Sequence, residues 1–119
     1  MGFNINIAWN LPEKTGLIYL REETVGDEEY AYAFRKIVIP VFEQFEPELI
    51  LVSCGFDSGW GDSIGNLKIS QYGYMYMTKE LTSLKRPIGL VLEGGYNIDV
   101  LRWGSKAVVR ALSDGLNQS

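Results

Sequence analysis

The sequence has 119 residues, the length of one ordinary domain, and a net charge of −4 from 11 basic and 15 acidic residues. This acidic balance argues against a nucleic-acid-binding surface, and no apolar run approaches the roughly 20 residues that a membrane-spanning helix needs. Histidine is absent, and the single cysteine, Cys54, cannot form an internal disulfide. Any catalytic mechanism therefore has to work without histidine or borrow one from outside these residues.

The first residues predict a strand followed by a long loop. Residues 3–9, FNINIAW, alternate between apolar and polar side chains as a half-buried strand does. Residues 10–26 contain Pro12 and Gly16 and read as a loop, which is long for a compact domain. Because the strand begins almost at Met1, we expect the chain to enter a larger fold partway.

The first predicted helix covers residues 27–45. Asp27 is a suitable N-cap, and two glutamates follow it at the positive end of the helix dipole. Pro40 predicts a kink or the start of a new turn. One apolar stripe is expected to face the core, and it consists of Tyr30, Phe34, Ile37, Val41 and Phe45.

Two apolar runs predict buried parallel strands. The run at Leu49–Val52 ends in Gly55 and then Asp57, and the run at 88–92 ends in Glu93-Gly94-Gly95-Tyr96-Asn97. The carboxyl ends of parallel strands meet at one edge of a sheet, which is where such folds bind their ligands. The sequence therefore predicts that a carboxylate and a phenol share one edge.

Helices are expected over residues 70–84, capped by Ser70, and over about 98–113, capped by Asn97. The resulting order β-α-β-α-β-α predicts an α/β fold with a parallel sheet. Three strands are few for such a sheet and would leave an exposed edge. We therefore expect a piece of a larger domain, or one half of an assembly.

The polar residues and Cys54 allow more than one interpretation from sequence alone. Asp57 is either a ligand for a cation or substrate, or a loop aspartate that bonds its own backbone. Asp62 and Glu93 are expected to be solvated or structural. Without histidine or cysteine partners, one or two carboxylates are poor zinc ligands, although they could hold magnesium through water. Cys54 is expected to be a buried core residue rather than a reactive thiol.

The turn at Gly94 and Gly95 is either a tight connection or an anion site at a helix N-terminus. Tyr96 could donate a hydrogen bond to a developing oxyanion. A receiver-type signalling domain has a similar length and an aspartate at a central strand end. That family also needs an acidic pair after the first strand and a late lysine, and neither is present here.

Several motifs resemble those in the carboxy-terminal part of a zinc-dependent histone deacetylase and follow in that family's order. The resemblance is closest to the class II branch. Shorter matches come at Gly61-Asp62, Gly65 and Gly73-Tyr74. The longer ones are GFNINIAWN at 2–10, GDEEY at 26–30, PELILVSCGFD at 47–57 and LEGGYN at 92–97. The resemblance covers nearly the whole chain, 1–119, and leaves 11–25 as an atypical insertion or loop.

The resemblance implies a partial three-layer arginase/deacetylase-like fold, a mostly parallel sheet with helices on both faces, of which this chain carries about the last three strands. It implies that Asp57 is one of three protein ligands of a catalytic Zn²⁺. Tyr96 would polarise the acetyl carbonyl, and Gly94 and Gly95 would line the acetyl-lysine tunnel. The implied reaction is hydrolysis of the amide of N-acetyl-lysine.

The implied partners are acetylated histones or other acetyl-lysine proteins and a corepressor complex that regulates chromatin, in the nucleus or the cytoplasm. Neither nucleic acid nor membrane binding is implied. The family's histidines lie upstream of Gly2 in family order, so we expect the 119 residues alone to be inactive. The alternative function is a catalytically inactive, deacetylase-like module that acts through binding.

Overall fold

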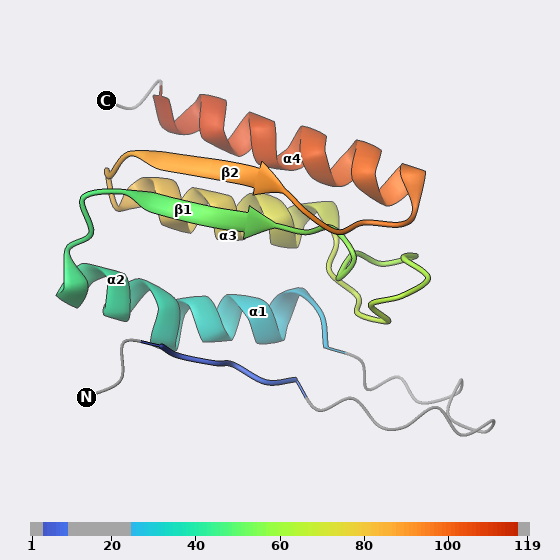
Figure 1. Cartoon of the computed structure of the whole chain (residues 1–119), viewed down its shortest axis with the longest axis horizontal. Coiled ribbons are helices and arrows are strands. Elements are labelled where there is room, and N and C mark those ends of the chain that lie inside the picture. Colours follow the sequence, from blue (N-terminus) through green and yellow to red (C-terminus); the bar gives the residue numbers. More distant parts are fainter. Residues whose placement is uncertain (1–3, 10–24, 117–119) are drawn as a thin grey trace.

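The computed structural model describes residues 4–9 and 25–116. Its elements follow in the order α1 (Asp27–Ala33), a π-helical segment (Phe34–Val38), α2 (Ile39–Phe45), β1 (Ile50–Cys54), α3 (Gln71–Ser83), β2 (Ile88–Leu92) and α4 (Ile98–Leu116). Figure 1 shows β1 and β2 side by side, with α4 along one edge of the pair and α1 and α2 along the other.

The two strands are parallel, as the sequence predicts. Ile50 lies opposite Ile88 and Cys54 lies opposite Leu92, so the strands start and end in register. The α3 helix connects them, which makes a β-α-β unit. Both carboxyl ends therefore point to the same edge of the sheet.

The predicted strand over 3–9 is wrong for the residues that the structure describes. Residues 4–9 form no strand, and most of them are exposed. A strand needs a neighbour for its backbone groups, whereas this segment runs beside α1 and away from the sheet (Figure 1). Phe3 and almost all of the predicted loop lie outside the described residues. The described part of the chain thus contains two of the three expected strands.

The first helix begins as predicted but is capped differently. Its N-cap is Gly26, whose backbone N–H donates to the Glu29 carboxylate over 2.8 Å. This bond lowers the pKa of Glu29. Asp27 is not the cap, because its carboxylate accepts hydrogen bonds from the backbone N–H of Ser70, over 2.8 Å, and from the Ser70 hydroxyl. Asp27 therefore fastens the start of α1 to the start of α3.

Pro40 produces the interruption that the sequence predicts. It lies in the first turn of α2, directly after the π-helical segment, in which the backbone N–H of Ile39 donates to the Phe34 carbonyl. Proline has no N–H and crowds the preceding turn, which favours such a change. The extra residue in this turn moves the inward face from the predicted Ile37 to Val38, and Phe45, also predicted to be inward, is 70% exposed.

The remaining caps agree with the sequence. The Ser70 hydroxyl accepts from the backbone N–H of Tyr72, and the side-chain oxygen of Asn97 accepts from that of Asp99. The last helix runs to Leu116, slightly beyond its predicted end. The helices pack on one another around a core of five buried residues, which are Phe56, Ile69, Tyr74, Val100 and Val108.

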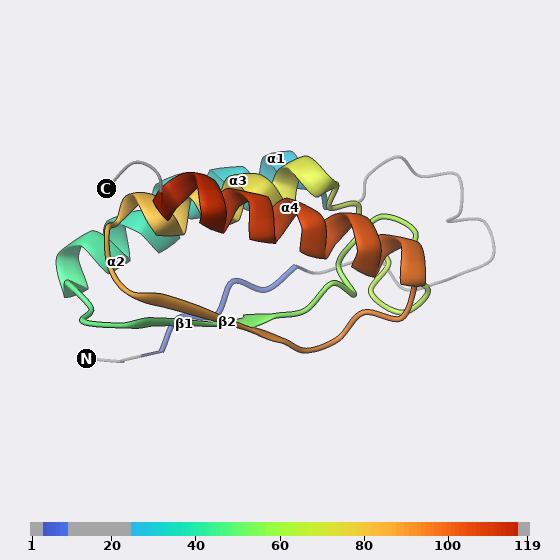
Figure 2. The ribbon, with the colours of Figure 1, turned by 90° about the horizontal axis from the view of Figure 1, so that it is seen from above.

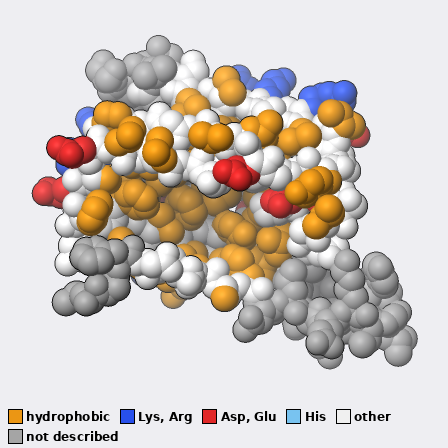
Figure 3. Space-filling view, viewed as in Figure 1, with side chains coloured by type: hydrophobic (Ala, Val, Ile, Leu, Met, Phe, Trp, Pro, Cys, Tyr) orange, Lys and Arg blue, Asp and Glu red, His pale blue; other side chains and the backbone are white. Residues whose placement is uncertain are grey.

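All helices that the structure describes lie on one side of the sheet (Figure 2). The second helical layer that the resemblance implies is not part of the described residues. The opposite face of the sheet is open and apolar, with Leu51 and Val91 72% and 59% exposed. Figure 3 views the molecule from this open side and shows hydrophobic side chains around a hollow.

Candidate functional site

The ends of β1 and β2 remain joined beyond the strands themselves. The backbone N–H of Glu93 donates to the Cys54 carbonyl over 3.2 Å, and that of Phe56 donates to the Gly94 carbonyl over 2.7 Å. These bonds hold the segments that follow β1 and β2 side by side beyond the end of the sheet. Asp57 and the Gly94–Tyr96 segment consequently lie together, as the sequence predicts.

The half-buried Asp57 carboxylate is surrounded by glycines. A Cβ atom on Gly94 would lie 2.6 Å from Oδ2 of Asp57, and one on Gly55 would lie 3.0 Å from Oδ1. The Asp57 carbonyl lies even closer to Gly65, where a Cβ would be 1.8 Å from the oxygen. Only residues without a side chain allow the backbone to approach this carboxylate so closely.

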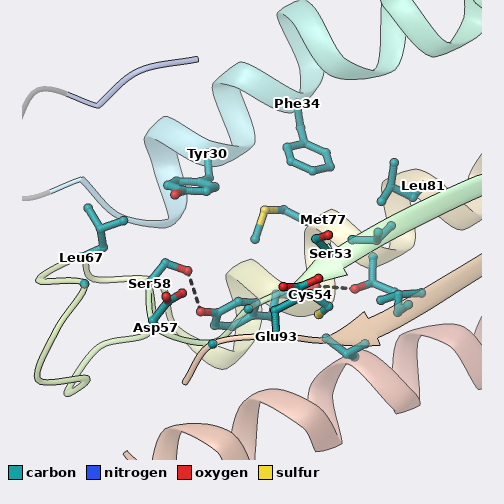
Figure 4. Close-up of a pocket in the computed structure, with 18 of the residues that line it drawn as sticks. Tyr30, Phe34, Ser53, Cys54, Asp57, Ser58, Leu67, Met77, Leu81 and Glu93 are labelled. Carbon is teal, nitrogen blue, oxygen red and sulfur yellow. Dashed lines mark hydrogen bonds between the residues drawn. The ribbon is translucent and has the colours of Figure 1, made fainter. Parts of the chain in front are cut away.

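A cavity of about 780 Å³ opens between β1, α1 and α3. Asp57, Glu93 and Tyr96 are among its polar lining residues, and Figure 4 shows Asp57 beside Ser58, with Glu93 farther along the cavity near Cys54. Neither lysine nor arginine is among the described residues that line it, so its charged groups are carboxylates. The apolar wall from the helices includes Tyr30, Phe34, Met77, Leu81 and Val108.

Tyr96, which is 59% exposed, and Gly94 are both among the residues that line the cavity. Gly95 is not among the lining residues that the structure describes. It adopts a φ of +139°, and a Cβ there would lie 2.7 Å from Leu101 and 3.2 Å from Phe56. Gly95 therefore provides a left-handed turn that packs on the core, and its part in a substrate tunnel stays a prediction.

Asp62 is buried, with 7% of its surface exposed. Its Oδ2 accepts from the backbone N–H of Tyr96 over 2.7 Å, and its Oδ1 accepts from those of Ile64 and Gly65 over 2.8 and 3.3 Å. Burial raises the pKa of Asp62, but the backbone donors outweigh it and hold the pKa below its ordinary value. Asp62 is thus structural, as expected.

Two further groups shape the wall of the cavity. The hydroxyls of Ser58 and Tyr74 are 2.7 Å apart and form a hydrogen bond, drawn as a dashed line in Figure 4. Tyr30 stacks on Trp9 with ring centroids 5.3 Å apart, and burial raises its pKa. Burial also raises the pKa of the Cys54 thiol. Cys54 packs against the core cluster but is only partly buried and lines the cavity, so the prediction of a buried core residue holds only in part.

The donors in this cavity fit only part of a zinc site. Asp57 offers a carboxylate in an open wall. However, no group of three or more candidate metal-binding side chains occurs among residues 4–9 and 25–116, and the sequence has no histidine. A catalytic zinc normally takes three protein ligands and keeps one open position. The described residues could supply one ligand and do not make a zinc site on their own.

Comparison with known proteins agrees with this geometry. Residues 1–112 match the family model described as the histone deacetylase domain. The chain belongs to the histone deacetylase family. It is 41% identical over 112 residues to histone deacetylase HDA1 of Candida albicans and 39% identical over 114 residues to human histone deacetylase 7. Each of these alignments covers 93% of this chain.

The fold agrees as well. The solved structure of the histone deacetylase Clr3 matches 75% of this chain with a TM-score of 0.73 and 40% identity. A curated relative from Schizosaccharomyces pombe has the same name. The HDA15 HD domain matches 74% with a TM-score of 0.71. This family membership confirms the predicted partial deacetylase-like α/β fold.

The chain is much shorter than these deacetylases. It spans 12–15% of the first three curated relatives, 15% of the Clr3 chain and 26% of the HDA15 chain. Among the described residues, no helix is long and apolar enough to cross a membrane.

Sequence reasoning did not foresee two features of the site. The link between Asp62 and Tyr96 joins residues 34 positions apart, and no local pattern indicates it. The Ser58–Tyr74 bond is equally non-local. The Gly61-Asp62 motif and the frequency of glycine around it were the available signals, because glycine marks places where backbones approach closely.

Proposed function

We propose that this chain supplies the carboxyl-edge half of the active site of a zinc-dependent lysine deacetylase. In this proposal Asp57 is a ligand of the metal and Tyr96 donates a hydrogen bond to the acetyl carbonyl. The observation that carries it is the arrangement of these two residues in the wall of one cavity, at the joined ends of two parallel strands.

Each residue would have a definite task. The Tyr96 phenol can donate to the oxygen that gains negative charge during amide hydrolysis, and such donors stabilise the transition state. Gly94 leaves the space into which the Asp57 carboxylate fits. When bound, zinc would act as a Lewis acid and lower the pKa of a bound water. Its remaining ligands and the histidine bases would have to come from outside these 119 residues.

The proposed substrate is an acetylated lysine on a histone or another protein. Membership of a corepressor complex and a location in the nucleus or cytoplasm are proposed with it, because they accompany this family. The cavity carries carboxylates and no lysine or arginine among its described lining residues, which suits a substrate whose lysine is surrounded by other basic residues.

The test uses the protein purified at its native length, assayed on an acetyl-lysine peptide. The Tyr96→Phe variant should retain its zinc and lose about 2.7–4 kcal/mol of transition-state stabilisation, as oxyanion-hole donors do. The matched control is Tyr72→Phe, since Tyr72 is exposed on α3 and absent from the cavity wall. Unchanged turnover of Tyr96→Phe would refute the role of the phenol.

The metal is tested separately. Asp57→Ala should lower the zinc content measured by atomic absorption, whereas Asp99→Asn should leave it unchanged. Asp99 is an exposed carboxylate that pairs with Arg102 on α4. A full zinc load in Asp57→Ala would contradict the assignment.

A second function is favoured by one observation, the incomplete set of metal ligands among the described residues. In that case the 119 residues act as a binding module without catalysis. We expect the purified 119-residue chain to release no acetate from an acetyl-lysine peptide in the presence of zinc. Zinc-dependent deacetylation by this chain alone would exclude the binding-module function.

A further inference from the structure

The loop after Asp57 and the segment of Tyr96 are held together by one buried carboxylate. Asp62 accepts through Oδ2 from the Tyr96 backbone and through Oδ1 from the backbones of Ile64 and Gly65. A second bond lies beside it, because the side-chain amide of Asn97 donates to the Gly61 carbonyl over 2.8 Å. The two segments are therefore joined at two neighbouring points.

The two carboxylate oxygens of Asp62 contact different parts of the proposed active site. Oδ2 binds the amide of Tyr96 itself. Oδ1 binds the amide of Gly65, and Gly65 is packed so closely on Asp57 that a Cβ would lie 1.8 Å from the Asp57 carbonyl. One carboxylate thus lies between the proposed metal ligand and the proposed oxyanion donor and relates their positions.

Tyr96 needs such a constraint. It follows two glycines, one of which has a left-handed backbone, and more than half of the residue is exposed. Glycines leave the backbone free to move. The hydrogen bond to a charged acceptor is stronger than one to a neutral acceptor, and here the accepting carboxylate is buried. Among the bonds that join the two segments, that of Asp62 is the one made to the Tyr96 backbone itself.

We propose that Asp62 is a positioning residue for the deacetylation reaction, which aims the Tyr96 phenol by holding the Tyr96 backbone against the loop that follows Asp57. The proposal rests on the proposed function of Tyr96. It also predicts a change that does not depend on activity, because the Tyr96 backbone amide should lose its protection from hydrogen exchange when Asp62 is changed.

The first test is a double-mutant cycle in the native-length protein, with Asp62→Asn, Tyr96→Phe and both together. Asp62→Asn should lower kcat by about 100-fold and change KM little, since a misplaced catalytic group costs this much. In the Tyr96→Phe protein, the same change should lower kcat by less than about threefold, because the residue through which Asp62 acts is already disabled. Asp99→Asn is the control and should keep the wild-type rate.

If Asp62 were purely structural, the double-mutant cycle would give a different result. Asp62→Asn would then lower kcat as much in the Tyr96→Phe protein as in the wild type, and this result would overturn the proposal. If Asp62→Asn does not fold, Asp62→Glu enters the same cycle, because it keeps the charge and moves the oxygens. The same comparison between the two backgrounds decides its outcome.

The second test does not depend on activity. Amide hydrogen exchange should be slow at Tyr96 in the wild type and at least tenfold faster in the Asp62 variant, while the Val52 amide in β1 keeps its protection. Unchanged exchange at Tyr96 would overturn the proposal even if the enzyme is active. An inactive wild type with the expected exchange pattern would instead refute the proposed function and leave the Asp62–Tyr96 link standing.

Discussion

The glycines around Asp57 show how strongly single residues determine this site. Gly94→Ala would place a Cβ atom 2.6 Å from the Asp57 carboxylate, so that either the backbone or the carboxylate must move. We expect a loss of about 1–3 kcal/mol in the free energy of unfolding, as for other overpacked sites. Urea denaturation followed by circular dichroism measures it.

The control for this substitution is Gly89→Ala in β2. A Cβ there would lie 3.3 Å from a methyl group of Leu51, which is exposed and can turn aside. The loss should therefore be clearly smaller. Equal losses at Gly89 and Gly94 would show that the close approach to Asp57 has no special effect on stability.

Asp62 makes the stability depend on pH. Its folded-state pKa is held below the ordinary value of 3.8, so the unfolded state binds the proton more readily. The stabilisation is fully present above that ordinary value and is lost as the pH falls through the lowered folded-state pKa. The unfolding free energy of the wild type should thus exceed that of Asp62→Asn at pH 7, and the gap should shrink below pH ~4. A gap that does not change with pH would contradict this assignment.

Sequence reasoning located Asp57 and Tyr96 correctly at one edge because strand ends are a local property. A short, largely apolar run with a glycine within three residues of its end suffices to define each strand end. The links of Asp62 were beyond such reasoning, since one of its hydrogen-bond partners is a backbone amide 34 residues away. Gly94 and Gly95 look equivalent in sequence, but only Gly94 is among the described residues that line the cavity.

At the scale of the elements, the junction between α1 and α3 depends on Ser70. Its hydroxyl caps α3 and also donates to the Asp27 carboxylate at the start of α1. Ser70→Ala removes both bonds, and we expect a loss of about 1–2 kcal/mol, the upper range for an N-cap. Thermal unfolding checks this. Ser83→Ala, which removes only an exposed bond to the Glu80 carbonyl, is the control and should have little effect.

The helices also show where periodicity misleads. The predicted stripe over residues 27–45 assumes one regular α-helix. The π-helical segment inserts one extra residue per turn and shifts the inward face, so that Phe45 points outward. Pro40 indicated the interruption, but no residue indicates how far the face turns. The caps Ser70 and Asn97 were predictable because the capping bonds reach only two or three residues.

At the scale of the whole molecule, the open face of the sheet determines how the isolated chain behaves. Leu51 and Val91 lie exposed on neighbouring strands, and no helix of the described part covers them (Figure 2). We expect the 119-residue chain to bind the dye ANS and to aggregate on heating, because exposed apolar patches associate. The double variant Leu51→Lys/Val91→Lys should bind less dye. A sharp, reversible melt of the wild type without dye binding would contradict this expectation.

The parallel pair of strands and the helices around it could be predicted from continuous apolar runs, helical periodicity and turn residues. The third strand at residues 3–9 could not, because alternation shows only that a segment could form a strand. Whether it does depends on a neighbouring strand, and the described part of the chain offers none beside it. A non-local partner decides the state of such a segment.

The stacking of Trp9 on Tyr30 gives the cavity an optical signal of its own. Tyr30 forms part of the cavity wall, and its ring transfers excitation efficiently to an indole only 5.3 Å away. The chain has two other tryptophans, of which Trp60 is exposed on the loop after β1 and Trp103 packs near Tyr74 in the core. Because the three indoles lie in three environments, single-tryptophan variants can report separately, through their fluorescence, on the cavity wall, the loop after β1 and the core.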